Sequence, residues 1–460
     1  MKKILTIAAL FAAILTSNSQ ALGYQDLGVL FSQNDNNGSA RFTAMSGAFG
    51  SLGGDVSSIN INPAGLSVFK NSVFVGTFNS RNTDITSNYY GNSRTTQDQF
   101  INLSHAGAVL VFDSAYSKEW SKFAIGFNYR ITKDFNENFT AEGNSGIATF
   151  TEYPLDNNTP TIVYDTADGQ RFTNTNSGEI SELNIGFSSV HLNKLHIGLG
   201  LNFYDLNFSQ QTTLTEFNSD SNGNELDANL YQENFTTGTG FSLNAGFIYK
   251  AHPNFRFGLA YQTPTWFTEI IEESNILNND GFYGDTEIVV SNDNLIYDNT
   301  SGGYFPSQQL IYKLKTPSKL TASAAFIFGK NGLLSLDYTN KSYSNTKLSG
   351  ADFSIENESF QNDFKNTNNF NVGTEWRFDR LSVRGGYKYE ESPYETAIDS
   401  DNLEGYSLGA GYNFGNFKLD FSYSDNNKTA AYNMYPGFNV NTTNLTLDNR
   451  VFTASVTLGL

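Results

Sequence analysis

Residues 183–203 read LNIGFSSVHLNKLHIGLGLNF. Apolar residues alternate with small or polar ones on both sides of Asn193-Lys194, and such a two-residue connection is typical of a tight hairpin. A period of two residues predicts a β-strand with one apolar face. The stretch therefore predicts two antiparallel strands joined by a short turn.

The same alternation recurs from about residue 71 to the C-terminus, in segments of about ten residues. The opposite face carries Gly, Ser, Asn and Thr, whereas a soluble sandwich would present more Lys and Glu to water. A small, polar interior with an aromatic exterior is typical of a transmembrane barrel. Tyrosines near segment ends fit an interfacial girdle, namely Tyr249, Tyr338, Tyr389 and Tyr423.

The connections between these segments alternate between short and long. The short ones lie near 113–121, 193–194, 251–254, 330–331, 379–380 and 415–416. The long ones lie near 80–99, 134–179, 211–236, 268–317, 344–366, 391–402 and 426–448. This alternation predicts an all-β fold, a 14-stranded antiparallel transmembrane β-barrel over residues 71–460, with short turns and both termini in the periplasm of a bacterial outer membrane.

Composition excludes several other classes of protein. The chain of 460 residues has 46 acidic and 28 basic residues, a net charge of −18 and a pI of about 4.6, which argues against nucleic-acid binding. It contains no cysteine, so disulfides and cysteine metal sites are impossible. A polytopic helical membrane protein is also excluded, because the sequence has no series of apolar runs about 20 residues long.

The N-terminus has the features of a secretory signal peptide. Lys2 and Lys3 precede an apolar run from Ile4 to Leu15, and Ser19-Gln20-Ala21 fits a small-x-small cleavage site. We therefore expect a signal peptide over residues 1–21. A membrane anchor helix is the alternative, but the run is too short to cross a bilayer core of about 30 Å.

Residues 22–70 lack the alternation and predict a separate N-terminal hatch inside the barrel. Their central part, residues 38–66, reads GSARFTAMSGAFGSLGGDVSSININPAGL. Gly47 and Gly53-Gly54 predict turns, Asp55 fits the cap of a short helix, and Asn62-Pro63 marks a turn or a helix start.

This central part resembles the hatch of the FadL-like long-chain fatty acid transporters of the bacterial outer membrane. Asn62-Pro63-Ala64 matches the NPA motif of that family at the expected distance before the first strand. The resemblance covers residues 38–66 at motif level and the rest of the chain only in architecture. It implies that Asn62, Pro63 and Ala64 fix the hatch against the wall; a plain turn before the first strand is the alternative.

The resemblance also implies a function. A hydrophobic molecule would be captured at the external loops, enter an apolar pocket, and leave sideways beside a kinked third strand when the hatch rearranges. Long-chain fatty acids are the expected substrate, while aromatic hydrocarbons, haem-like molecules and other lipids stay open. The third strand, assigned to Lys122–Lys133, shows no proline or bulge, so no lateral gap is visible in it. The alternative function is a FadL-like barrel that docks partner proteins in an outer-membrane assembly such as a secretion machine.

Five residues are candidates for binding the ligand. By strand parity Arg130, Arg384 and Lys388 point inward with Arg377, where they would bind a carboxylate or, alternatively, pair with Glu375 or Asp420. Apolar residues lie on both faces of 100–112. Ile101 and Leu103 there belong either to an apolar lumen patch or to a strand of ambiguous register.

The sequence offers no catalytic unit, cofactor site or metal site. Ser104 neighbours His105, so on one strand the two side chains are expected to face opposite sides. The stretch 218–223 partly resembles a calcium loop but has Asn229 where the bidentate glutamate belongs, so a solvated loop is favoured. We expect no enzyme and no cofactor. The expected partners are a hydrophobic small molecule, outer-membrane lipid and an optional outer-membrane protein.

Overall fold

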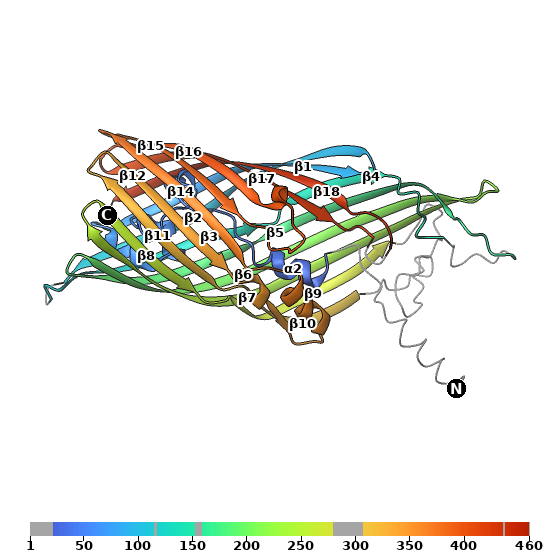
Figure 1. Cartoon of the computed structure of the whole chain (residues 1–460), viewed down its shortest axis with the longest axis horizontal. Helices are drawn as coiled ribbons and strands as arrows, with labels where there is room; N and C mark the ends of the chain where they lie inside the picture. Colours follow the sequence, from blue (N-terminus) through green and yellow to red (C-terminus); the bar gives the residue numbers. More distant parts are fainter. Residues whose placement is uncertain (1–21, 115–116, 152–158, 279–306, 436–437, 460) are drawn as a thin grey trace.

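The computed structural model describes residues 22–114, 117–151, 159–278, 307–435 and 438–459, and most of them form one closed antiparallel sheet (Figure 1). The predicted signal peptide lies outside the described residues. The strands are β1 Val73–Tyr89, β2 Asn92–Asp113, β3 Trp120–Asp134, β4 Glu137–Gly143, β5 Thr166–His191, β6 Leu195–Ser219, β7 Glu225–His252, β8 Phe255–Gln262, β9 Trp266–Asn278, β10 Ser307–Lys315, β11 Lys319–Phe328, β12 Gly332–Lys341, β13 Lys347–Ser349, β14 Thr367–Phe378, β15 Leu381–Glu390, β16 Leu403–Asn413, β17 Phe417–Tyr432 and β18 Thr443–Gly459.

The 18 strands make 14 crossings of the barrel wall, which confirms the predicted fold class. Four crossings are each broken into two strands, namely β3 with β4, β8 with β9, β10 with β11, and β12 with β13. Pro264 and Pro317 stand in two of the breaks. A proline cannot donate to the hydrogen-bond ladder of a sheet, which accounts for those two interruptions. β1 pairs with β18 and with β2, and this closes the cylinder.

The helices are short and lie inside the barrel or in its connections. They are α2 Tyr24–Leu30, α3 Ala40–Ala44, η1 Val56–Asn60, η2 Pro63–Val68, η3 Tyr343–Asn345, α4 Ser354–Asn362 and η4 Asp399–Asp401. None of the helices in the described ranges is long and apolar enough to cross a membrane.

The two ends of the described chain lie in different places. Gly459, at the C-terminal end of β18, lies at the end of the barrel that carries the short turns (Figure 1). The backbone N–H of Leu22 donates to Oε1 of Gln210 on β6 at 3.0 Å, inside the barrel. Gly459 thus lies at the short-turn end and Leu22 lies inside the barrel, while the assignment of both termini to the periplasm stays a prediction.

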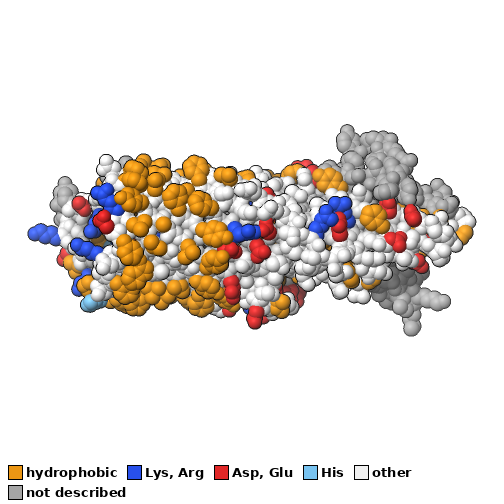
Figure 2. Space-filling view, turned by 90° about the horizontal axis from the view of Figure 1, so that it is seen from above, with side chains coloured by type: hydrophobic (Ala, Val, Ile, Leu, Met, Phe, Trp, Pro, Cys, Tyr) orange, Lys and Arg blue, Asp and Glu red, His pale blue; other side chains and the backbone are white. Residues whose placement is uncertain are grey.

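The polar and apolar faces of the wall change sides along the barrel axis. We call the short-turn end of the barrel its lower end and the opposite end its upper end. On the lower part of β6, Leu199, Leu201 and Phe203 point outward and are 65%, 41% and 48% exposed. Above them the outward residues are polar, and Leu206 and Phe208 are buried on the inner face. Figure 2 shows the outward apolar side chains gathered in one band near the short-turn end. We call this band the membrane zone and the strand extensions beyond it the outer zone.

The outer zone corrects the predicted long loops. Much of 134–179 and most of 211–236 were predicted as loops, but the structure forms β4, the first half of β5 and a long β6–β7 hairpin there. These strands carry their apolar residues inward, and Phe139, Phe172 and Leu214 join one buried cluster. The loop prediction was wrong because Asn, Ser and Thr on the outward face of an extramembrane strand resemble loop composition.

Candidate functional site

The hatch fills the lumen of the barrel with three capped helical turns. Ser39 caps α3 by accepting from the N–H of Phe42, and Asp55 caps η1 by accepting from Ser57. Asn62 caps η2, which begins at Pro63, because its side chain accepts from the N–H of Ala64. Side-chain caps of this kind satisfy the N–H groups that the first turn of a helix leaves free.

The Asn62-Pro63-Ala64 motif joins the hatch to the wall. Nδ2 of Asn62 donates to the carbonyl oxygen of Gly50 at 2.7 Å and to that of Phe247 on β7 at 3.0 Å. Pro63 and Ala64 press against Gly198 of β6, where an added Cβ would stand 2.3 Å from the nitrogen of Ala64. The motif is thus a helix start that also contacts the wall, which a plain turn before the first strand would not do.

Glycines of the wall make room for the hatch. At Gly386 on β15, an added Cβ would lie 2.6 Å from the carbonyl carbon of Met45, so no larger residue fits without moving α3. At other wall glycines an added Cβ would lie between 2.5 and 3.0 Å from an atom of the hatch, namely at Gly107, Gly126, Gly186, Gly246, Gly258, Gly373 and Gly409. We call these seven residues, together with Gly198 and Gly386, the glycine collar.

The glycines predicted in the hatch occupy turns. Gly47, Gly53 and Gly54 have φ values of 77°, 61° and 69°, in the left-handed region that glycine adopts without strain. At Gly53 an added Cβ would also stand 2.7 Å from the Cα of Gly65. These positions fold the hatch back on itself between α3 and η2.

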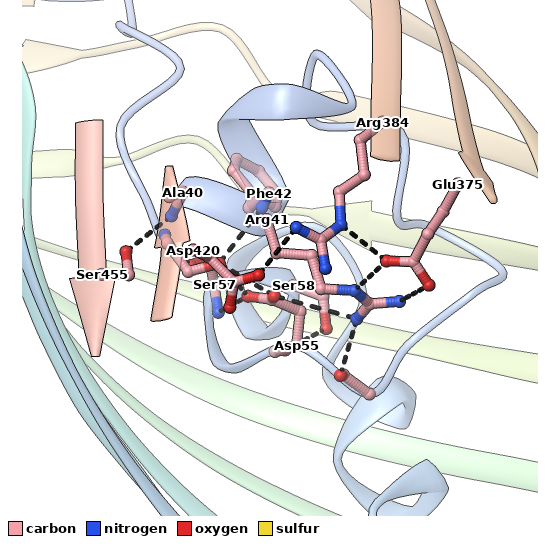
Figure 3. A network of polar contacts seen from close by, with 12 residues as sticks. Ala40, Arg41, Phe42, Asp55, Ser57, Ser58, Glu375, Arg384, Asp420 and Ser455 are labelled. Atoms are coloured by element: carbon pink, nitrogen blue, oxygen red, sulfur yellow. Dashed lines mark hydrogen bonds and ion pairs between the residues drawn. The ribbon is translucent and has the colours of Figure 1, made fainter. Parts of the chain in front are cut away.

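An ion-pair network joins α3 to the wall (Figure 3). Nε of Arg41 donates to Oε2 of Glu375 on β14 at 2.7 Å, and its Nη1 donates to the carbonyl oxygen of Gly54. Nε of Arg384 donates to the same carboxylate at 2.7 Å, and its Nη1 donates to Asp420 at 2.7 Å. Glu375 is only 1% exposed. The predicted alternative for Arg384, an ion pair with Glu375 or Asp420, is what the structure has.

Hydroxyl groups add further contacts between α3 and the wall. The N–H of Ala40 donates to Oγ of Ser455 at 2.6 Å. Oγ of Ser46 and Oγ of Ser407 lie 2.8 Å apart. Asp55 accepts from Oγ of Ser39 within the hatch.

Arg130 and Lys388 border a polar cavity of about 120 Å³ between the hatch and the wall. Arg130 is paired, since its Nε donates to Oε2 of Glu182 at 2.7 Å. Lys388 is only 9% exposed, and within the described chain no hydrogen bond or ion pair involves its amine. Lys319 on β11 borders the same cavity; it is partly exposed, and its amine likewise makes no hydrogen bond or ion pair within the described chain. Of the three predicted ligand-binding cations, Lys388 is therefore the one that has no hydrogen-bonding or ionic partner within the described chain.

Ile101 and Leu103 do not line the lumen, which corrects the apolar-patch interpretation. They lie 68% and 49% exposed on the outer surface. The register of β1 and β2 shifts between Thr77 and Phe78, and the bulge on β2 turns both Ser104 and His105 inward. Ser104 and His105 therefore do not face opposite sides as expected. The ambiguous pattern in 100–112 is thus a bulge that swaps the two faces.

His105 contacts the hatch rather than a catalytic partner. Its Nε2 lies 3.3 Å from Oγ of Ser57, and its Nδ1 lies 3.1 Å from Oγ1 of Thr77. The loop at 218–223 is an ordinary turn, because Oδ1 of Asp220 accepts from the N–H groups of Asn222 and Asn224. No cluster of metal-ligating side chains occurs in the described ranges.

The third crossing is broken, which the sequence did not reveal. β2 and β3 pair only from His105–Arg130 downward, and β3 ends at Asp134. β4 then lies against the inner face of β1, where Oγ of Ser87 donates to the carbonyl oxygen of Thr140 at 2.6 Å. Between 101–104 of β2 and 131–134 of β3 the described residues make no ladder hydrogen bonds, and we call this stretch the lateral seam. Polar residues at three successive positions, 132–134, were the one sequence signal of the break.

Comparisons with known proteins agree with this architecture. The family model described as "Outer membrane protein transport protein (OMPP1/FadL/TodX)" matches residues 28–448. No curated protein matches the chain. A FadL homologue from Pseudomonas aeruginosa is similar in structure, with a TM-score of 0.62 and 16% identity over 93% of this chain and 99% of the other.

Two solved channels for aromatic compounds are also similar. The toluene transporter TodX from Pseudomonas putida has a TM-score of 0.52 and 14% identity, over 93% of this chain and 99% of that one. The monoaromatic hydrocarbon channel CymD has a TM-score of 0.51 and 13% identity, again over 93% and 99%. At such identities these likenesses show the shared fold.

Proposed function

The chain belongs to the OMPP1/FadL/TodX family of outer membrane transport proteins, and from this premise we propose that it takes up long-chain fatty acids by passive diffusion. The family transports hydrophobic molecules through the outer membrane, and the barrel fold agrees with that location. In this proposal, rearrangement of the hatch admits the ligand, and the ligand leaves sideways through the wall. Asn62, Pro63 and Ala64 would hold the hatch while this happens.

The lateral seam is the observation that carries the proposal. It lies at the upper edge of the membrane zone, beside the outward-facing Leu103 and Phe78. Strands without ladder hydrogen bonds can separate at a lower cost than paired ones. A ligand leaving here would enter the lipid directly. An acyl chain gains about 0.8 kcal/mol for each buried CH₂ group, so this route avoids returning the chain to water.

The cavity beside the hatch supports an acidic rather than a neutral ligand. Lys388 and Lys319 both border it without a bonded partner in the described chain, and the ammonium group of the buried Lys388 is costly unless it is compensated. A carboxylate head would supply that compensation, whereas toluene would not. The similar structures include both a FadL homologue and a toluene transporter, so they do not decide between the two ligand classes.

The upper lumen is closed by packed apolar side chains, which is why a rearrangement is part of the proposal. Leu27 and Val29 of α2 pack in one buried cluster with Phe208, Phe267 and Phe360 from the wall and from α4. A molecule entering from the long-connection end has to displace these contacts. The same apolar surface would then solvate an acyl chain.

Uptake of labelled oleate and labelled toluene into proteoliposomes tests the proposal. We expect saturable oleate uptake above that of empty liposomes, and a loss of threefold or more in Lys388→Ala. Lys347→Ala, which removes an exposed cation on β13, is the matched control and should behave like the wild type. Toluene uptake without oleate uptake would overturn the fatty acid assignment. No uptake of either, together with a stoichiometric protein partner on purification, would favour the docking alternative.

A further inference from the structure

The segment of the hatch between α2 and α3 lies along the free edge of β3. The backbone N–H of Asp35 donates to the carbonyl oxygen of Thr132 at 2.6 Å. In return, the N–H of Asp134 donates to Oδ2 of Asp35 at 2.9 Å. Nδ2 of Asn37 donates to the carbonyl oxygen of Ile131 at 3.0 Å. Each of these three contacts satisfies a group of the β3 edge that a neighbouring strand would otherwise satisfy.

The neighbouring strand that is missing at this edge is β2. The two strands pair His105 with Arg130 and then separate. If the pairing of His105 with Arg130 continued without the bulge at Ser104, Leu103 would stand opposite Thr132. The hatch residues therefore substitute for β2 along the upper edge of β3, and they do so from the lumen side.

Charged side chains of β1 and β3 also stabilise this contact between the hatch and the edge of β3. Nζ of Lys133 lies 3.4 Å from Oδ1 of Asp35. Nη2 of Arg81 on β1 donates to Oδ1 of Asp134 at 3.2 Å and to the carbonyl oxygen of Asn136 at 2.5 Å. Burial opposes the ionisation of Asp35, yet the nearby Lys133 ammonium and Arg81 guanidinium groups hold its pKa below its usual range. Asp35 is thus a partly buried carboxylate, 26% exposed, that is both paired and hydrogen-bonded to β3.

We infer that Asp35 and Asn37 are positioning residues that keep β3 bent and the lateral seam unpaired while the hatch is seated. When the hatch moves away, the edge of β3 loses its partners and is free to pair with β2. The hatch and the seam then act as alternating gates. While the hatch is in place β2 and β3 stay unpaired at the seam, and when the hatch is displaced the two strands pair and close the seam. This inference deepens the proposed function, since the role of the seam as an exit rests on it.

The absence of cysteine in the chain permits a direct test by disulfide trapping. In Leu103→Cys/Thr132→Cys the two thiols come into bonding range only if β2 and β3 pair in the continued register, because directly opposed residues have Cα atoms about 4.5–5.5 Å apart. We expect slow disulfide formation in the otherwise native chain in lipid vesicles. We expect formation about tenfold faster or more when Asp35→Leu is added.

Three further variants separate a specific role from general damage to the hatch. Asp35→Asn keeps an oxygen that can accept from Asp134 and should restore slow trapping. Asn37→Ala should accelerate trapping to a smaller extent than Asp35→Leu. Asn34→Ala is the matched control, because its Nδ2 donates to the carbonyl oxygen of Ser32 within the hatch and not to β3. All variants are first checked for the heat-dependent gel shift of a folded barrel.

The outcomes distinguish this inference from the proposed function. Equal trapping rates in folded wild-type and Asp35→Leu backgrounds would overturn the inference, whatever the uptake results. If Asp35→Leu accelerates trapping and the trapped protein no longer transports oleate, both are supported. If trapping is accelerated but oleate uptake by the trapped protein persists, the link between hatch and seam stands and the lateral exit fails.

Discussion

The membrane zone and the outer zone are built from the same strands with opposite arrangements of polarity. On β6, Leu199 faces lipid and Asn202 faces the lumen, whereas a few residues later Asn207 faces water and Phe208 faces the lumen. The two-residue period continues without interruption. Because lipid surrounds the membrane zone and water surrounds the outer zone, the apolar residues lie on the outer face in the first and on the inner face in the second.

The difference also decides how each zone holds the hatch. In the membrane zone the inner wall is small and polar, so α3 is held by the Glu375 network, by hydroxyl contacts and by close approach to glycine. In the outer zone α2 is held by apolar packing, with Phe360 of α4 against Gly28. The lower hatch is therefore attached by directional bonds together with small apolar clusters, such as Phe42 and Met45 with Ala325 and Leu333 of the wall. The upper hatch is attached by one larger hydrophobic core.

The largest expected effect is the loss of the carboxylate that anchors the lower hatch. Glu375→Ala leaves Arg41 and Arg384 buried without their shared partner, and breaking a buried ion pair in this way costs about 3–5 kcal/mol. We expect faster hydrogen exchange in residues 40–47 and a lower unfolding midpoint. Arg94→Ala, which breaks an exposed pair with Glu142, should cost less than about 1 kcal/mol. Equal effects of the two changes would contradict the assignment.

The next effect tests the boundary between the zones on one strand. Leu199→Lys places a charge on the lipid face and should destabilise the barrel by about 2–4 kcal/mol. Asn207→Lys makes the same charge on the same outward face of β6 in the outer zone, where we expect a change within about 0.5 kcal/mol. Urea unfolding from lipid vesicles measures both. A large cost at Asn207 would place lipid higher than the apolar band.

A smaller effect is expected at the hatch motif. Asn62→Ala removes the cap of η2 and two hydrogen bonds, one of them to the wall, and should cost about 1–2 kcal/mol. Hydrogen exchange of residues 63–68 should rise while that of α2 stays unchanged, because α2 is held by the outer-zone cluster. Loosening of α2 to the same degree would show that the two parts of the hatch are one unit.

The smallest effect concerns the tip of the β6–β7 hairpin in water. Hydrogen bonds from the Asn224 and Asn222 side chains and N–H groups lower the pKa of Asp220 to about 2. Because this pKa is depressed in the folded state, the contribution of Asp220 is present at neutral pH and is lost as the pH falls from about 4 to about 2. A carboxyl NMR titration should give this midpoint, and Asn224→Ala should raise it. An unchanged value in that variant would sink the explanation.

The parts of the fold that follow from a simple period were predictable. The alternation and the Asn193-Lys194 turn predicted the strands and their number. Strand parity placed Arg384 inward and offered an ion pair with Glu375 or Asp420 as the alternative to ligand binding, and the structure has both pairs. The outer zone was missed because water on the outside gives a strand the composition of a loop. The faces of Ile101 and Leu103 were missed because a bulge adds one residue that no periodic pattern announces. The break after Asp134 was missed because contacts with Asp35, distant in sequence, stabilise it.

The glycine collar has a consequence for the permeability barrier of the cell. Because these wall residues have no side chains, the wall does not fill the bore at the level where the hatch sits. A chain that folds without its hatch would leave a water-filled hole in the outer membrane. The small wall residues thus leave closure of the bore to the hatch, and cells with a dislodged hatch should become more permeable to antibiotics.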